Sequence, residues 1–124
     1  MCEKVVSILE RLVQKDPTNN GLQRDLGVSL DDVALIYYGL GEGKKALEYY
    51  MRSLEIKRLL VEKEPKVVDR HIGLAIALLD MFRVTKDEEG KRGFVMVAYR
   101  ITKSLVDSGV NHPELSILRE IFSL

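Results

Sequence analysis

The sequence lacks the features that mark several large classes of protein. Among its 124 residues Cys2 is the only cysteine, so no disulfide can form within the chain. Nineteen basic side chains balance nineteen acidic ones, which leaves a formal net charge of +0. This balance lacks the positive excess typical of nucleic-acid-binding proteins and of polybasic membrane-surface proteins. No uninterrupted apolar run has membrane-spanning length. We therefore predict a cytoplasmic setting, with no nucleic-acid partner and no membrane.

Residues that could carry out chemistry are also scarce. The two histidines, His71 and His112, lie far apart in the sequence, and no Cys/His cluster has the spacing of metal ligands. No serine lies in a nucleophile-elbow motif, and we identify no base for Cys2. The glycines between positions 39 and 43 do not follow a strand, so a phosphate-binding loop is not expected. We predict no catalytic residue, no metal site, no cofactor and no enzymatic activity.

Proline is rare as well, and its positions divide the chain. Pro17, Pro65 and Pro113 each lie between segments in which apolar residues recur at helical spacing. Because proline cannot continue a helix from within, these residues indicate helix boundaries. No strand-like alternation competes with the helical pattern. The pattern predicts an all-α fold of about six helices arranged as antiparallel hairpins. The first four helices are expected at about 2–15, 21–40, 44–63 and 66–83. A fifth helix is expected to end near 107, and the last one to start at 111.

Turn and capping residues refine these boundaries. Asn19 or Asn20 can cap the second helix, and the two remain alternatives. Thr85–Gly93 is charged and reads as the polar turn before the fifth helix. Gly109 is placed to end that helix in a left-handed conformation. Asn111 is expected to begin the last helix, because Glu114 follows three residues later as in a capping box.

One segment of the chain occurs twice. The sequence Lys15-Asp16-Pro17 returns 48 residues later as Lys63-Glu64-Pro65. Arg24–Leu30 returns 46 residues later as Arg70–Ile76. Self-similarity at a period of this size predicts stacked helical repeats, in which one repeat cannot bury its apolar face alone.

The clearest copy, residues 30–56, resembles the tetratricopeptide repeat. The matching positions are large, small and aromatic residues at the family's spacing: Leu30, Val33, Ala34, Tyr37, Gly41, Ala46, Tyr50 and Ser53. The resemblance implies close packing of two helices, in which small residues admit the aromatic side chains of the partner helix. Arg58 stands where the family has its closing proline, so the repeat resembles an extended variety.

The whole chain reads as one domain, residues 1–124. It divides into a half repeat (1–17), a repeat (20–65), a degenerate repeat (66–108) and a closing helix (111–124). An offset of 46 for the degenerate copy would align the glycines but bury Asp80 and Arg83 without partners. We prefer an offset of 45, which keeps both charges off the core and predicts a core face of Ala75, Leu78, Leu79 and Phe82.

The resemblance implies that first helices of successive repeats line a concave groove. The residues it places there are Arg24, Val28, Asp31, Leu35, Tyr38, Arg70, Gly73, Ile76, Asp80 and Arg83. Their mixture of charged and apolar side chains suits an amphipathic peptide or helix. The clamp by which some family members hold a C-terminal carboxylate is absent, since Asp31 and Leu35 occupy its positions. The alternative is that the closing helix fills the groove.

These features predict a non-enzymatic scaffold or adaptor that binds a protein or peptide. The alternative function is a helical regulatory or sensory domain that binds a small ligand or nucleic acid. The apolar stripes of the first and last helices also predict self-association, as a two-fold homodimer, unless the array continues or both stripes are used within the monomer. These stripes are Val5, Val6, Leu9, Leu12 and Val13, and Ile117, Leu118, Ile121 and Phe122.

Overall fold

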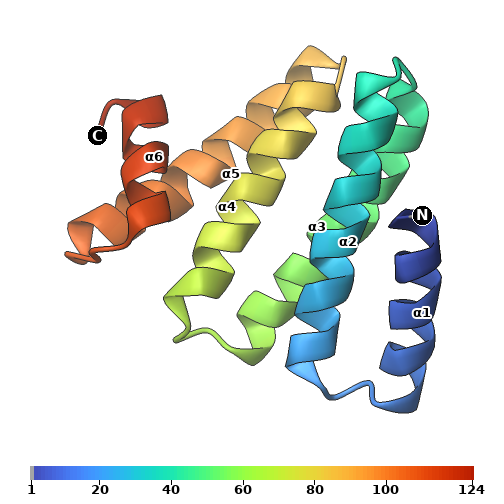
Figure 1. Cartoon of the computed structure of the whole chain (residues 1–124). Helices are drawn as coiled ribbons and strands as arrows, with labels where there is room; N and C mark the ends of the chain where they lie inside the picture. The colour runs from blue at the N-terminus through green and yellow to red at the C-terminus, as the bar shows by residue number, and fades with distance from the viewer. Residues whose placement is uncertain (1) are drawn as a thin grey trace.

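The computed structural model describes residues 2–124, with side chains from residue 3 onward (Figure 1). This part of the chain forms six helices and no strand, which confirms the predicted all-α class. The helices are α1 (Cys2–Lys15), α2 (Asn20–Gly39), α3 (Gly43–Lys63), α4 (Val68–Val84), α5 (Glu88–Asp107) and α6 (Pro113–Phe122).

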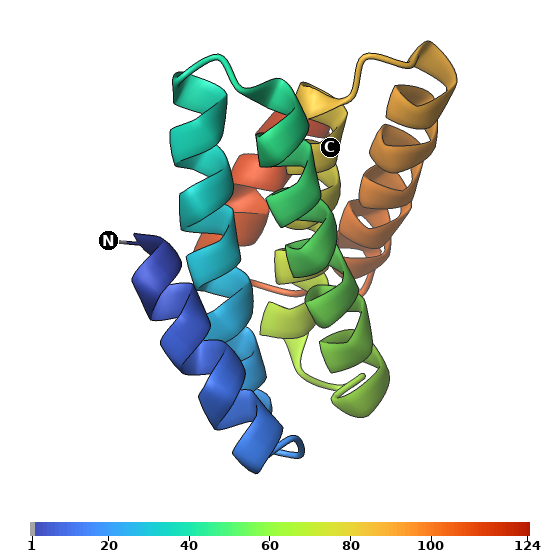
Figure 2. The same ribbon diagram turned by 90° about the vertical axis from the view of Figure 1, so that its right-hand side faces the viewer.

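The helices form a row of hairpins. Helices α2 and α3 make one antiparallel hairpin and α4 and α5 the next, and α1 and α6 lie at opposite ends (Figure 1). Figure 2 looks from the α1 end and places α6 behind the hairpins. Within residues 2–124, none of the helices is long and apolar enough to cross a membrane.

Two of the predicted boundary signals have the expected geometry. The Asn19 side chain accepts a hydrogen bond from the Leu22 backbone N–H at 3.1 Å, so Asn19 rather than Asn20 caps α2. Gly109 has φ 76°, a left-handed conformation that glycine adopts without steric cost, and it follows the end of α5 as predicted.

Two other boundary predictions are wrong. The Asp87 side chain accepts a hydrogen bond from the Gly90 N–H at 2.9 Å, so α5 begins at Glu88 and the polar segment up to Gly93 is helical. The cap of α6 is His112 rather than Asn111: its Nδ1 accepts from the Glu114 N–H at 3.1 Å. In both cases a side chain satisfies a free N–H of the first helical turn, which fixes where the helix starts.

The core runs through the array as three connected clusters. The front cluster joins α1 to α2, the central cluster joins both hairpins, and the rear cluster joins α4 to α6. Their buried members are Val6, Leu26, Leu30 and Val33 in front, Ala34, Tyr50, Leu54, Ala77, Leu78, Met81 and Ala98 in the centre, and Ile72, Ala75, Leu115 and Leu118 at the rear.

Small residues allow α2 and α3 to approach closely. The buried Ser53 hydroxyl donates to the Gly27 carbonyl at 3.2 Å, across the two helices. A Cβ added at Gly27 would lie 3.5 Å from Cγ2 of Ile56, at ordinary contact distance. Ala46, another small residue of the repeat pattern, is 0% exposed. These contacts fix the α2/α3 hairpin that positions the inner surface described below.

The core face predicted for α4 is partly wrong. Ala75 and Leu78 are buried as expected and Leu79 is partly buried, but Phe82 is 37% exposed. Met81 takes a place in the central cluster instead. Phe82 lies beneath Lys91 of α5, whose Nζ is 5.1 Å from the ring centroid.

Candidate functional site: the groove between α2 and α4

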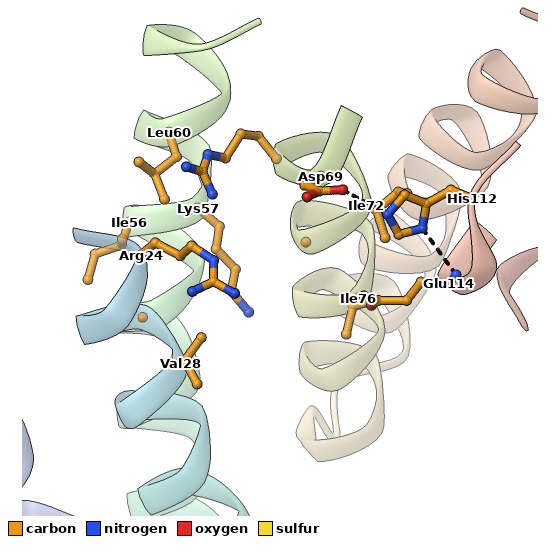
Figure 3. Close-up of a pocket in the computed structure, with 13 residues that line it drawn as sticks. Arg24, Val28, Ile56, Lys57, Leu60, Asp69, Ile72, Ile76, His112 and Glu114 are labelled. Atoms are coloured by element: carbon orange, nitrogen blue, oxygen red, sulfur yellow. Dashed lines mark hydrogen bonds and ion pairs between the residues drawn. The ribbon is translucent and has the colours of Figure 1, made fainter. Parts of the chain in front are cut away.

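A cavity of about 220 Å³ opens between α2 and α4, the first helices of the two hairpins (Figure 3). Residues of α3 and the start of α6 complete its lining. Five of the residues predicted for the groove line it: Arg24, Val28, Arg70, Gly73 and Ile76. The structure therefore brings together predicted residues from both copies of the repeat.

The cavity has apolar surface on each side. Val28 of α2 is 44% exposed, and Ile76 of α4 is half-buried on the facing side. The α3 residues Ile56 and Leu60 also line the cavity. Sequence reasoning missed this contribution of α3, although Ile56 and Leu60 lie four residues apart and so share one side of a helix.

The cations at the cavity are mostly paired with carboxylates. Lys57 donates to Asp31, and both side chains are largely shielded from solvent. Arg70 Nε donates to Glu64 Oε1 at 2.7 Å. Arg24 is different: its side chain is 59% exposed and lies 3.4 Å from the equally exposed Asp25. Arg24 is thus the cation at the cavity that is least constrained by a partner.

His112 connects α6 to α4 at one wall of the cavity (Figure 3). Its Nδ1 accepts the Glu114 N–H, so the proton of the neutral ring is on Nε2. Nε2 then donates to Asp69 Oδ1 at 2.7 Å. The residue holds the first turn of α6 against α4, which shapes the wall. The sequence offered only its position beside Pro113 as a signal.

A second group of predicted residues lies farther along α2 and α4. Arg83 Nη2 donates to the Tyr50 hydroxyl at 3.0 Å and to Asp80 Oδ1 at 3.2 Å. The guanidinium carbon of Arg83 is 5.3 Å from the centroid of the Tyr38 ring. Arg83 therefore connects Tyr38 of α2, Tyr50 of α3 and Asp80 of α4, and none of these residues lines the cavity.

The remaining predicted groove residues lie outside the cavity. Leu35 is 53% exposed on α2 and does not join the cavity lining. Asp31 lies behind Lys57, and its Oδ1 is buried without a hydrogen-bond partner among the described residues. Both residues were assigned by repeat position alone.

Helix α6 forms a wall of the groove and leaves the cavity open. Its buried residues Leu115 and Leu118 pack with Ile72 and Ala75 of α4 in the rear cluster. Within α6, only Glu114 belongs to the cavity lining. His112, which also lines the cavity, is the cap residue just before the helix.

The environment of Asp80 predicts a pH-dependent stability. Burial raises the pKa of the Asp80 carboxyl above its usual 3.8, the nearby Arg83 opposes this rise and Asp31 adds to it. For a carboxyl whose folded pKa is raised, stability is highest below the unfolded pKa and falls as pH rises through the folded value.

We therefore expect Asp80→Asn to gain stability relative to the wild type as pH rises from about 3 to about 7. Urea unfolding at several pH values measures the difference in unfolding free energy. Asp107→Asn, at a carboxylate that is 62% exposed, is the matched control. A difference that stays constant or shrinks over this pH interval would contradict the burial argument.

Among residues 2–124, no group of three or more His, Cys, Asp or Glu side chains is arranged to hold a metal ion. Comparisons with protein-family models, with curated proteins and with solved structures found no match.

Proposed function

We propose that this protein is a non-enzymatic interaction scaffold whose groove between α2 and α4 binds an amphipathic peptide or helix of a partner protein. The observation that carries the proposal is the cavity itself, which is lined by predicted groove residues from both repeats. Its lining combines apolar side chains with charged side chains of both signs, which suits an amphipathic segment. We place this activity in the cytoplasm, in keeping with the single cysteine.

The size of the cavity favours a peptide over a small ligand. Its volume of about 220 Å³ is below the roughly 300–1,000 Å³ of pockets that enclose drug-sized molecules. A cavity of this size instead suits one or two apolar side chains of a segment that lies along the groove. The paired state of Lys57 and Arg70 also leaves little free positive charge for a nucleic acid.

The buried positions support a tetratricopeptide-like repeat as the basis of this scaffold. Leu30, Val33, Ala34, Tyr50 and Ser53 are all buried where the two-helix pattern requires it. We propose that the extended repeat serves to hold α2 and α4 side by side, so that their inner surfaces form one binding groove.

A random peptide library displayed on phage, selected on the immobilised protein, tests the proposal. We expect selected peptides to carry apolar residues at i and i+3 or i+4. Val28→Glu should weaken their binding about tenfold or more, since it places a carboxylate at the apolar side of the cavity. Fluorescence anisotropy of a labelled peptide measures the change.

The matched control is Ile36→Glu on the same helix. Ile36 is 49% exposed, close to the 44% of Val28, but it does not line the cavity. Equal losses in the two variants, or no loss in Val28→Glu, would contradict binding in the groove. A different result would be a small molecule that copurifies with the protein, stays bound when peptide is added and still binds the Val28→Glu variant. Such a result would favour the alternative function, a regulatory domain that binds a small ligand at a site other than the groove.

A further inference from the structure

Helix α1 carries an exposed apolar stripe that the fold does not use. Val5, Ile8 and Leu12, called here the α1 stripe, are 44%, 46% and 41% exposed. They recur at i, i+3 and i+7, so they share one side of the helix. A different side, which includes the buried Val6, packs on α2. The α1 stripe is therefore a continuous apolar surface with no helix on it among the described residues.

The internal repeat indicates which kind of element fits the α1 stripe. The 48-residue offset that aligns Lys15–Pro17 with Lys63–Pro65 also aligns the stripe with three positions of α3. These positions are Ser53, Ile56 and Leu60.

In α3, the first two of these positions face α2, the first helix of the hairpin. Ser53 donates to the Gly27 carbonyl of α2, and Ile56 lies beside the same glycine. Leu60 is 3% exposed and lines the cavity between α2 and α4. The α1 stripe thus corresponds to the surface on which the second helix of a hairpin packs against its first helix. Within residues 2–124, no helix occupies this place beside α1.

Helix α6 also has an outer side on which no other described helix packs. It follows the α4/α5 hairpin as α4 follows α2/α3, so it occupies the place of a first helix whose second helix is not among residues 2–124. Leu115 and Leu118 are buried against the array, whereas Ile117 and Ile121 are 59% and 56% exposed. Ile117 and Ile121, called here the α6 stripe, lie at i and i+4 on the outer side.

The charges beside the two stripes are mainly opposite in sign, although the exposed Asp16 follows Leu12 by four residues at the end of the α1 stripe. The α1 stripe is bordered by three exposed cations, and the α6 stripe by two exposed carboxylates. These are Lys4, Arg11 and Lys15 on α1, and Glu114 and Glu120 on α6. None of the five takes part in an ion pair within residues 3–124. Opposite charges around two apolar centres favour their contact and set its register.

We propose that the α6 stripe of one copy packs on the α1 stripe of a second copy, so that the two helices complete a hairpin shared between chains. The two surfaces differ, so the contact is heterologous and leaves one free stripe at each end. Assembly therefore continues in a head-to-tail row of copies, in contrast to the two-fold dimer predicted from the apolar stripes alone. This assembly does not depend on peptide binding in the groove.

Two variants with one blocked stripe each provide the test. Ile8→Glu places a carboxylate in the α1 stripe, and Ile117→Glu places one in the α6 stripe. Both sites are exposed in one copy, so each variant should fold, which circular dichroism checks. Sedimentation velocity from about 10 µM to about 1 mM covers the range expected for a small interface.

We expect the wild-type mass to rise with concentration beyond two chains, and each variant alone to remain monomeric. An equimolar mixture should form a species of two chains and no larger, because one intact α6 stripe meets one intact α1 stripe. The control Leu59→Glu, at a residue that is 47% exposed on α3, should assemble as the wild type does.

Two results would overturn the proposal. A variant blocked at α6 that still forms dimers would indicate a two-fold contact through α1. A wild-type protein that stays monomeric throughout would show that any occupant of the stripes is something other than a second copy.

Discussion

Replacing Tyr50 with alanine is expected to lower the free energy of unfolding by about 3–5 kcal/mol. Tyr50 is 3% exposed and belongs to the central cluster, where it meets residues of α2, α4 and α5. Its hydroxyl also accepts the hydrogen bond from Arg83 at 3.0 Å. A loss of this size is a large part of the total stability of a small domain. Urea unfolding followed by circular dichroism measures it.

Tyr50→Phe separates the ring from the hydroxyl. This variant keeps the packing of the ring and loses only the hydrogen bond to Arg83, so it should cost about 0.5–1.5 kcal/mol. A loss below about 1 kcal/mol for Tyr50→Ala would mean that the ring is not packed between the two hairpins, and the assignment of helix faces would fail.

The second large effect is expected at the opposite end of the array. Leu118 is 1% exposed in the rear cluster and is one of only two buried residues of α6. Leu118→Ala should cost about 2–5 kcal/mol, through lost apolar contact and the cavity left behind. Because α6 is short and depends on this contact, we expect its amides to lose more hydrogen-exchange protection than those of α2 and α3.

Ile117→Ala is the matched control for this change. Ile117 is the preceding residue of the same helix and is 59% exposed, so at a concentration at which the protein is monomeric its replacement should change stability by at most about 0.5 kcal/mol. Equal effects of the two substitutions would show that α6 does not dock through Leu118. The packing of α6 on α4 would then no longer explain how His112 is held at the wall of the cavity.

Most helices could be predicted because their signals are local. Apolar spacing, the three prolines and Gly109 act within a few residues, and the structure agrees with them. The start of α5 was missed because its charged first turns resemble a solvated turn, and only the Asp87 cap shows that they are helical. The cap of α6 was missed because the orientation of the His112 ring depends on its hydrogen bond to Asp69, a residue 43 positions away in the sequence.

The groove could be predicted only in part for a similar reason. Repeat position identified Val28 and Ile76, because residues on first helices repeat with the array. It could not identify Ile56 or the cap residue His112, which reach the cavity from α3 and from the start of α6. Phe82 was wrongly assigned to the core because α4 packs on neighbours at two sides, which turns Met81 inward instead.

The most direct test of the groove proposal is an amide NMR titration of the protein with a peptide selected on it. Gly27 and Gly73 line the cavity, whereas Gly43 begins α3 and lies outside the lining. We predict that the Gly27 and Gly73 amide signals shift progressively with peptide while the Gly43 signal stays in place. Shifts centred on Gly43, with Gly27 and Gly73 unchanged at saturation, would contradict the account.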